Sequence, residues 1–365
     1  MNSAATDFDG FNKYIRITDI SESSNKFVPS PLTSPDGNLD EKFKLKEGDI
    51  VFARTGASTG KTYIYDKNDG NLYFAGFLIK FNINKAYPKF VFYNTLKDEY
   101  KNWVSVMSVR SGQPGINSNE YKKLPLNIPS LDEQKKISDF LESIDSKINL
   151  LKKKYEYYQE FKKYLMQQIF AGKLRFDYEI LKLKDISKIN KGKQLNKDAM
   201  IENGKYYVLN GGKEPSGYTN EWNTSENTIT ISEGGNSCGY VNFNTEKFWS
   251  GGHCYYLSDL HENVDDYYLY SYLKFKEEFI MRLRVGSGLP NIQKGDIENI
   301  KIQIVSKNDQ NKISKLLLSA DKKINSIQIQ KENFENFKKG LLQQMFVYRI
   351  KFLISVRKSV ASNIF

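Results

Sequence analysis

The two halves of this chain repeat each other. A shift of 176 positions aligns residues 111–170 with residues 287–346 without a gap, and 24 of the 60 aligned positions are identical. A repeat of this length defines how many structural units a chain contains before any single motif is considered. The sequence therefore predicts two copies of one unit.

Upstream of these segments the halves share a layout but little identity. The segment GDIVFARTGASTGK (residues 48–61) corresponds, at a shift of about 179 positions, to NTITISEGGNSCGY (residues 227–240). Each half is thus a variable part followed by a shared part. We expect two lobes with different surfaces on similar supports, because one hydrophobic core seldom serves a chain of 365 residues.

The shared part is predicted to be a long helix. Residues 131–170 contain neither Pro nor Gly, and their apolar residues recur at alternating steps of four and three. This spacing is typical of a helix that pairs with another helix, and 40 residues make a rod of roughly 60 Å. Polar residues interrupt the seam at Lys162 and, in the second copy, at Lys331 and Lys338.

The second copy keeps the same register, so each helix has a matching mate in the same chain. We prefer an antiparallel intramolecular coiled coil to two unrelated surface helices. The predicted seam consists of Ile137, Leu141, Ile144, Ile148, Leu151, Tyr158, Leu165, Ile313, Leu317, Ile324, Ile327, Phe334 and Leu341.

The variable parts have the character of strands and turns. Runs rich in strand-forming residues lie between Gly, Asn and Asp, at residues 49–53, 62–65, 227–232 and 240–243. Short helices are expected near residues 89–103 and 264–281. The predicted fold class is α+β: two globular lobes, each with a twisted β-sheet and short helices, separated by the two long helices.

The charge of the chain favours a polyanionic partner. The formal net charge is +11 and the pI is about 9.2, although a Lys-rich chain can also be merely solvated. The polar loops of both halves add side chains that bind bases or phosphates, where a single such residue would more often be only solvated. The candidate DNA-binding residues are Arg54, Thr55, Ser58, Thr59, Lys61, Arg110, Ser111, Gln113, Asn117, Asn210, Lys213, Asn236, Ser237, Arg284, Ser287, Asn291 and Gln293.

Two other motifs do not support a catalytic or metal site. GASTGKT (residues 56–62) resembles a phosphate-binding P-loop, but three residues separate its glycines where that motif needs four. Strand-forming residues follow it, whereas a P-loop leads into a helix. The set of His253, Cys254, Cys238 and His261 does not have the spacing of a standard metal site, so we expect no bound metal.

The sequence also indicates a cytoplasmic protein. Its two cysteines support neither a disulfide framework nor a zinc site. No segment approaches the roughly 20 apolar residues of a membrane helix. The N-terminus carries Asp7 and Asp9 rather than a basic stretch followed by an apolar run.

Several segments together resemble a known family. They are GDIVFARTGASTGK, the closing SGQPGI and SGLPNI, the helix entry LPLNIPSLDEQKKI and the helix end FKKYLMQQIF. The chain resembles the specificity subunits of type I restriction-modification systems over roughly residues 10–347. The resemblance implies two target recognition domains, each binding one half of a bipartite, asymmetric DNA site. It also implies that the two helices pair antiparallel, fix the gap between the half-sites and dock partner subunits.

By this resemblance the chain is a non-catalytic subunit. It contains no Asp- or Asn-Pro-Pro-aromatic motif for methylating a base, no intact P-loop and no convincing nuclease carboxylate cluster. The implied partners are double-stranded DNA, two methyltransferase (modification) subunits and motor-nuclease (restriction) subunits. No cofactor is expected on this chain, while S-adenosylmethionine, ATP and magnesium are implied for the partner subunits.

The predicted domain boundaries follow from the repeat. They are 1–128 and 177–305 for the recognition domains, 129–176 and 306–347 for the spacer helices, and 348–365 for a tail of unknown role. The second domain has a lead-in at residues 181–193 for which the first has no equivalent. We therefore expect the first domain to be truncated, with the tail either filling the missing edge or lying free.

Two alternatives stay open. A coiled-coil interaction module with lobes that bind protein rather than DNA also accounts for the helices, although the basic loops argue against it. The same lobes also suit the specificity component of a fused or related restriction system.

Overall fold

The computed structural model describes residues 1–344 except 2, 175, 287 and 289. The chain forms two compact units, each with part of both long helices. The first unit contains Met1–Leu150 and the residues from Gln330 onward, and the second contains Leu151–Ile329. This division cuts through both helices, so the domain boundaries given above stay a prediction. The predicted tail 348–365 lies outside the described residues.

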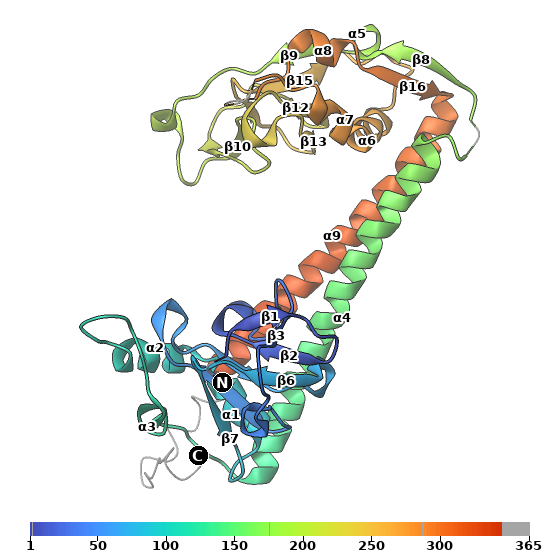
Figure 1. The fold of residues 1–365 in the computed structure, drawn as a ribbon. Helices are drawn as coiled ribbons and strands as arrows, with labels where there is room; N and C mark the ends of the chain where they lie inside the picture. The colour runs from blue at the N-terminus through green and yellow to red at the C-terminus, as the bar shows by residue number, and fades with distance from the viewer. Residues whose placement is uncertain (2, 175, 287, 289, 345–365) are drawn as a thin grey trace. The chain divides into compact units, whose positions relative to one another are not determined.

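The first lobe, which is the part of the first unit outside the long helices, is built on small sheets (Figure 1). Its central strand β4 (Asp49–Ala53) pairs antiparallel with β5 (Thr62–Ile64) and β7 (Leu78–Asn82). The other strands are β2 (Asn12–Ile15), which is parallel to β6 (Asn71–Phe74), and β1 (Ala5–Asp7), which is antiparallel to β3 (Thr33–Pro35). The helices are α1 (Pro88–Asn94), α2 (Asp98–Met107), α3 (Ser118–Tyr121) and the 3-10 turns η1 (Ile17–Asp19), η2 (Glu41–Phe43), η3 (Gly56–Ser58) and η4 (Lys67–Asp69).

Strand β4 is buried on both of its faces. Successive side chains of a strand point to opposite sides of the sheet. Ile50 and Phe52 accordingly pack into the core that contains α1 and α2, whereas Val51 and Ala53 pack into the core around β2 and β6. An uninterrupted apolar run is therefore a strand here, because two cores lie on either side of it.

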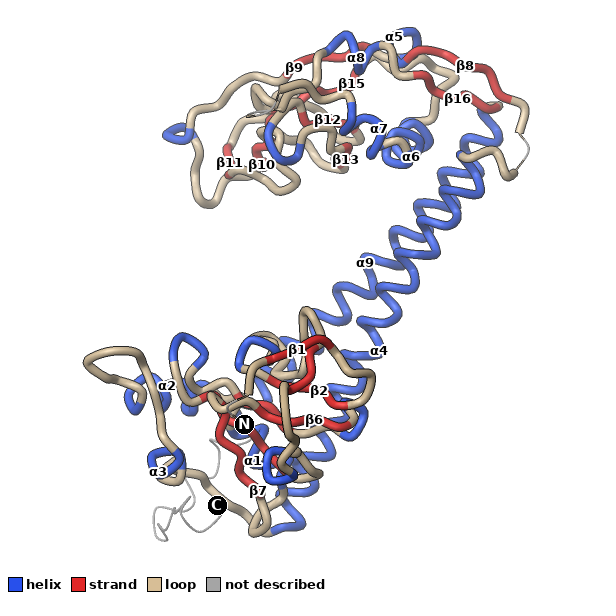
Figure 2. The backbone as a smooth tube through the Cα atoms, in the orientation of Figure 1, coloured by secondary structure: helices blue, strands red, loops and turns tan. Residues whose placement is uncertain are grey.

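The second lobe, which is the corresponding part of the second unit, contains a longer central sheet (Figure 2). The order of this sheet is β13 (Val241–Asn244), β12 (Thr228–Ser232), β15 (Cys254–Ser258), β9 (Lys188–Lys191). The remaining strands are β10 (Tyr206–Leu209) between β11 (Gly217–Thr219) and β14 (Trp249–Ser250), and β8 (Tyr178–Lys182) against β16 (Lys301–Val305). The helices are α5 (Leu183–Ile186), α6 (Asp266–Phe275), α7 (Glu277–Arg282), α8 (Lys294–Glu298) and the 3-10 turns η5 (Lys197–Ala199) and η6 (Gly235–Ser237).

The predicted elements of the lobes are confirmed with two corrections. All four predicted strands exist within one residue of their expected ends. Each predicted short helix is instead two helices, α1 with α2 and α6 with α7. In the first lobe the break falls at Thr95, whose hydroxyl donates a hydrogen bond to the Phe92 carbonyl at 2.7 Å and so ends α1. The lead-in predicted at residues 181–193 contributes to β8, α5 and β9, and β9 adds the fourth strand of the central sheet.

The two predicted long helices are present as α4 (Leu131–Phe170) and α9 (Lys307–Gln344). They pair in both units. In the first unit Asp145 lies 2.6 Å from Lys338, and the Lys147 ammonium lies over the ring of Phe334. Positions rise along α4 as they fall along α9, so the helices are antiparallel, as expected. They are drawn in green and orange-red in Figure 1.

A repeated glutamine attaches each long helix to its own lobe. Gln134 accepts a hydrogen bond from the backbone of Tyr87 and donates one to the Pro129 carbonyl, both at 2.8 Å. Gln310, which is 176 positions later, makes the equivalent bonds with Asp265 and Val305 at 2.8 Å. Both side chains are buried, and removing one would leave buried backbone groups unpaired, at a cost of about 1–3 kcal/mol. This explains why these positions are identical in the two halves.

The predicted seam residues are buried or half-buried, and none is exposed. The outermost ones also pack on the lobes: Ile137, Leu141 and Leu341 adjoin the core of the first lobe, and Ile313 and Leu317 that of the second. The ends of each helix therefore serve both the helix pair and the lobe.

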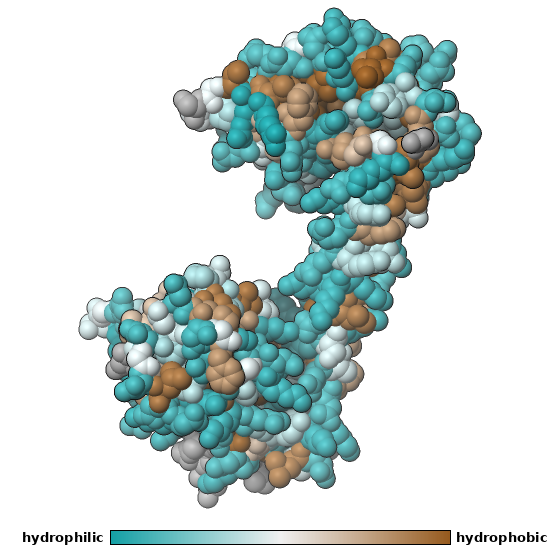
Figure 3. Space-filling model, turned by 45° about the vertical axis from the view of Figure 1, so that its right-hand side comes forward, coloured by the Kyte–Doolittle hydropathy of each residue, from teal (hydrophilic) through white to brown (hydrophobic). Residues whose placement is uncertain are grey.

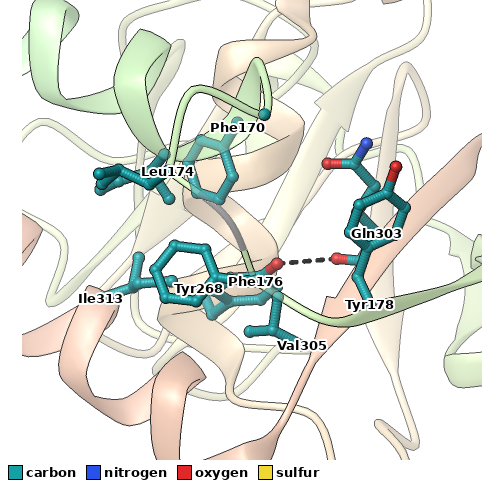
Figure 4. Close-up of a pocket in the computed structure, with 10 residues that line it drawn as sticks. Phe170, Leu174, Phe176, Tyr178, Tyr268, Gln303, Val305 and Ile313 are labelled. Carbon is teal, nitrogen blue, oxygen red and sulfur yellow. Dashed lines mark hydrogen bonds between the residues drawn. The ribbon is translucent and has the colours of Figure 1, made fainter.

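The chain leaves α4 by folding back over its last turn (Figure 4). Phe170, Leu174 and Phe176 meet Tyr268, whose hydroxyl donates a hydrogen bond to the Gln303 carbonyl at 2.8 Å. The cavity that they line has a volume of only about 20 Å³, enough for a water molecule rather than a ligand. Within the described part of the chain, no helix is both long and apolar enough to cross a membrane.

We expect Leu317→Ala to lower the free energy of unfolding by about 2–5 kcal/mol, because it leaves a cavity where α9 meets the core of the second lobe. Leu317 is fully buried, whereas its neighbour Leu316 is 48% exposed. Leu316→Ala is thus the matched control and should change stability by no more than about 0.5 kcal/mol. Urea denaturation of both variants measures this, and equal losses would contradict the assignment of the buried face.

Candidate DNA-binding loops

In the first lobe, the loop between β4 and β5 is held against a segment far away in the sequence. The backbone of Gly56 donates a hydrogen bond to the Pro114 carbonyl, and that of Ile116 donates one to the Arg54 carbonyl, both at 2.9 Å. The hydroxyl of Thr59 donates one to the Gly56 carbonyl at 2.7 Å. These bonds bring the candidates of residues 54–61 beside those of residues 113–117.

The second lobe repeats this arrangement. The backbone of Gly235 donates to the Pro290 carbonyl at 3.0 Å, and that of Ile292 donates to the Glu233 carbonyl at 2.9 Å. The loop between β12 and β13 therefore lies beside residues 290–293. We call each pair of joined segments a loop frame: residues 54–61 with 113–117 in the first lobe, and 233–240 with 290–293 in the second.

A glycine closes each loop because the space beside it is already filled. Gly60 has a φ of +92°, and a Cβ there would lie 2.6 Å from the Val104 side chain. Gly239 has a φ of +87°, and its Cβ would lie 2.8 Å from the Met281 backbone. The glycines of GDIVFARTGASTGK thus shape a tight turn, and the next residues form β5, not the helix of a P-loop.

One position in the frame carries opposite charges in the two lobes. The backbone of Arg54 donates to the Phe77 carbonyl, and that of Glu233 donates to the His253 carbonyl, both at 3.0 Å. Each residue also accepts a hydrogen bond from the isoleucine of its frame, so the two are structural equivalents. Arg54 is exposed, and no other described side chain pairs with its guanidinium.

Glu233, unlike Arg54, is surrounded by side chains that pair with it. Its side chain is buried, with Lys191 at 2.6 Å and the hydroxyl of Tyr255 at 3.1 Å from Oε1. His253 Nδ1 lies 3.6 Å from Oε2, which has no hydrogen-bond partner among the described residues. Burial and this carboxylate raise the pKa of Tyr255 to about 12. The second lobe thus presents Lys191 and His253 where the first presents Arg54.

A hollow of about 830 Å³ opens beside the frame of the first lobe. Arg54 and Thr55 line it together with Arg16 and Phe77. The guanidinium of Arg16 is held by two hydrogen bonds to the buried Asp19, whereas Phe77 is exposed. Most of the other lining residues are small or apolar, so the side chains here that suit a nucleic-acid backbone and its bases are the exposed Arg54 and Phe77.

Three candidates of the first lobe have partners within the protein. Nη2 of Arg110 lies 2.6 Å from both carboxylate oxygens of Glu120. Asn117 caps α3 by accepting a hydrogen bond from the Glu120 backbone at 3.0 Å. Lys61 pairs with Glu22 at 2.9 Å. Their local roles are structural, and their contacts with DNA stay a prediction. Ser111 and Gln113 are exposed, whereas Thr55, Ser58 and Thr59 are half-buried.

The candidates of the second lobe are spread more widely. Asn236 and Ser237 lie on η6, and Asn291 forms a β-bridge with Gly234. Arg284 and Gln293 are exposed close by in the chain. The remaining candidates lie elsewhere: Asn210 accepts a hydrogen bond from the His253 backbone, Lys213 lies over the Tyr240 ring, and Ser287 is outside the described residues.

Residue types alone missed Arg16, Phe77, Lys191 and Glu233. The repeat, carried upstream through equivalent backbone hydrogen bonds, finds Phe77 and Glu233, whereas Arg16 is found by the lining of the hollow and Lys191 by its ion pair with Glu233. His253, Cys254, Cys238 and His261 were not expected to bind a metal. Of these, Cys254 is buried, which raises the pKa of its thiol to about 11. The described residues contain no group of three or more His, Cys, Asp or Glu that could hold a metal ion.

Two lobes with one loop frame and different side chains, each seated on a shared helix pair, define a protein with two separate binding surfaces. The chain belongs to the type I restriction modification DNA specificity domain family, whose model matches residues 1–157 and 176–334.

Two relatives support this assignment. Over 344 residues the chain is 26% identical to a protein named as the type I restriction enzyme MjaX specificity subunit of Methanocaldococcus jannaschii, covering 85% of this chain and 80% of that one. Over 144 residues it is 37% identical to a type I specificity subunit of Mycoplasma pneumoniae, covering 39% and 38% of the two chains.

Solved structures show the same fold. The S subunit of a type I restriction-modification system from M. genitalium matches with a TM-score of 0.67 at 18% identity, over 95% of this chain and 92% of that one. A chain from a structure on complex assembly and conformational transition of the type I system matches with a TM-score of 0.54 at 16% identity, over 95% of both chains.

We expect Gly60→Ala to destabilise the first lobe by about 1–3 kcal/mol more than Gly56→Ala, since the branched side chain of Val104 has little room to move. Both glycines have positive φ, but a Cβ at Gly56 would meet nothing within 4 Å. The pair therefore separates crowding from backbone strain. Thermal unfolding measures the difference, and equal losses would show that the packing against Val104 does not matter.

Proposed function

We propose that this chain is the sequence-reading, non-catalytic subunit of a type I restriction-modification system. In this proposal each lobe binds one half of a bipartite, asymmetric DNA site. The observation that carries the proposal is the equivalence of the two loop frames together with the opposite charges of Arg54 and Glu233 at the same backbone position. Lobes with one frame and different side chains would read different half-sites.

The side chains suit this role chemically. Arginine pairs with guanine or phosphate, asparagine and glutamine pair with adenine, and hydroxyls hold phosphates. In the first lobe we propose Arg54 as the main contact, aided by Gln113 and the loop hydroxyls. In the second we propose Asn236, Arg284, Asn291 and Gln293. The bases read depend on DNA shape as well, so residue identity alone defines no code.

The chemistry on DNA then belongs to partners. We propose that two methyltransferase subunits and the motor-nuclease subunits assemble on this chain and bind S-adenosylmethionine, ATP and magnesium. Acting on chromosomal and invading DNA, such an assembly would be cytoplasmic. The alternative, a coiled-coil module with lobes that bind protein, has no specific observation in its favour.

An exposed aromatic stripe on α4 is the methyltransferase docking surface that we propose. Tyr157, Phe161 and Tyr164 are exposed on one face of the helix, and the rings of Tyr157 and Phe161 stack at 6.4 Å. Phe337, the repeat equivalent of Phe161, is exposed on α9. Figure 3 shows apolar patches among the hydrophilic side chains of the paired helices. Exposed aromatic clusters of this kind are typical of protein interfaces.

We expect Arg54→Ala to weaken binding to the cognate duplex by about 10-fold or more, since a good base contact contributes about 1–3 kcal/mol. Lys315→Ala, which removes an exposed charge from α9, is the control and should have little effect. Fluorescence anisotropy at two salt concentrations measures both. If the two variants lose equal affinity, only net charge matters and the assignment of the loop frame fails. Arg110→Ala should have a smaller effect than Arg54→Ala, because Glu120 already pairs with Arg110.

We expect Tyr157→Ser combined with Tyr164→Ser to weaken association with the cognate methyltransferase by about 10-fold or more, because aromatic anchors dominate such interfaces. Tyr218→Ser is the control, since Tyr218 is also exposed but lies on β11 of the second lobe. Sedimentation of the mixed proteins measures complex formation. Unchanged association of the double variant, with DNA binding intact, would place the docking surface elsewhere.

A further inference from the structure

Two clusters of polar and charged side chains lie between the long helices, where the seam of a helix pair is usually apolar. In the first unit Asp145 of α4 accepts a hydrogen bond from the hydroxyl of Tyr93, in α1, at 2.9 Å. The ammonium of Lys338, on α9, lies 2.6 Å from the other oxygen of Asp145 and 5.4 Å from the centre of the Tyr93 ring. We call these three residues the first cluster.

The second unit contains the same cluster. Asp321 of α9 accepts a hydrogen bond from the hydroxyl of Tyr267, in α6, and pairs with Lys162 of α4 at 2.6 Å. These three residues are the second cluster. Burial, together with the neighbouring aspartate, raises the pKa of each tyrosine, so each hydroxyl stays protonated and able to donate.

The clusters are related by the repeat, but they exchange partners. The two aspartates are 176 positions apart, and so are the two lysines. Each aspartate takes its tyrosine from its own half of the chain and its lysine from the other half. Each cluster therefore ties one lobe, its own helix and the opposite helix together.

Because these charges are partly buried, they favour one helix register more than they stabilise the fold. The four charged side chains are only 15–34% exposed, and both tyrosines are buried. A pair in such surroundings adds little stability over apolar residues, but a charge left there without its partner is costly. Polar residues inside a helix seam are known to select one register among several apolar alternatives.

One register satisfies both clusters at once. Asp145 and Lys162 are 17 positions apart on α4, and Asp321 and Lys338 are also 17 positions apart on α9. If α9 slipped by one heptad, neither lysine would face an aspartate. The residues opposite Lys162 and Lys338 would become Gln328 and Lys152 after a slip in one direction, and Ser314 and Ser138 after a slip in the other. In the second case Asp145 would face Lys331, but Asp321 would face Tyr155, so one of the two ion pairs would still be lost.

We infer that the two Tyr–Asp–Lys clusters fix the axial register of α4 against α9 within each unit. This inference does not rest on the proposed function. A slip of one heptad would move one helix past the other by about 10 Å. These residues position the helices and need not touch DNA.

Charge exchange on the full-length chain tests the inference. The first variant exchanges charges on α4 alone, with Asp145→Lys and Lys162→Asp, so that like charges meet in both clusters. The second makes the equivalent exchange on α9, with Asp321→Lys and Lys338→Asp. The fully exchanged variant carries all four changes and restores both ion pairs with reversed polarity. All three variants carry two aspartates and two lysines among these four positions, so their composition is the same.

A thiol crosslink reads the register without DNA. Lys147→Cys with Phe334→Cys places thiols on the two helices where the Lys147 ammonium reaches the Phe334 ring in the native register, and a short bifunctional thiol reagent joins them. Lys147→Cys with Leu341→Cys, or with Ile327→Cys, places them one heptad apart and reports a slip in one or the other direction. The native Cys238 and Cys254 are buried and should not interfere.

We expect the native crosslink to exceed the slipped one by at least about tenfold in the parent chain and the fully exchanged variant. In both half-exchanged variants this ratio should collapse, or the helix pair should fail to form. A native crosslink that survives half-exchange overturns the inference. So does a fully exchanged variant that behaves no better than the half-exchanged ones.

Discussion

A carboxylate shared between a tyrosine of the lobe and a lysine of the opposite helix is the contact on which the arrangement of each unit depends. Asp145 and Asp321 occupy this place in the two halves. An apolar seam holds two helices together but tolerates sliding, because one buried leucine replaces another at little cost. The half-buried ion pairs oppose sliding, since a slip of one heptad would leave Lys162 and Lys338 without a carboxylate opposite them. The buried Gln134 and Gln310 then fix each lobe on the first turns of its helix.

The loops of the two frames carry different side chains, but equivalent backbone hydrogen bonds support them. In both frames, main-chain hydrogen bonds and a crowded glycine hold the loop, so its side chains are free to vary without loss of the fold. Arg54 and Glu233 show how far this variation goes: one side chain is exposed and unpaired among the described residues, and the other is buried under Lys191 and His253. Membership of the DNA specificity family gives this variability a purpose, because recognition of two unlike half-sites requires two unlike surfaces.

The sequence predicted the long helices, their antiparallel pairing and the strands around the loops, because these follow from periodicity and from the repeat. It did not reveal the break at Thr95, which depends on a side-chain hydrogen bond to Phe92. Nor did it reveal that Arg110 pairs with Glu120, since the two are ten positions apart and no pattern marks the contact. The alignment of residues 48–61 with residues 227–240 already pairs Arg54 with Glu233, but the equivalent backbone hydrogen bonds were needed to show that the two occupy the same place in their lobes. The aspartates and lysines of the two clusters recur in the repeat, but their exchange of partners required the structure.

The most direct test of the account is to map methylated bases in DNA from cells that contain the cognate methyltransferase, with and without this chain. The account predicts that the chain adds one motif made of two different half-sites at a single fixed gap, because two unlike lobes are carried on helices in one register. A contiguous motif, or two half-sites separated by variable gaps, would contradict it, and so would identical methylation in the presence and absence of the chain.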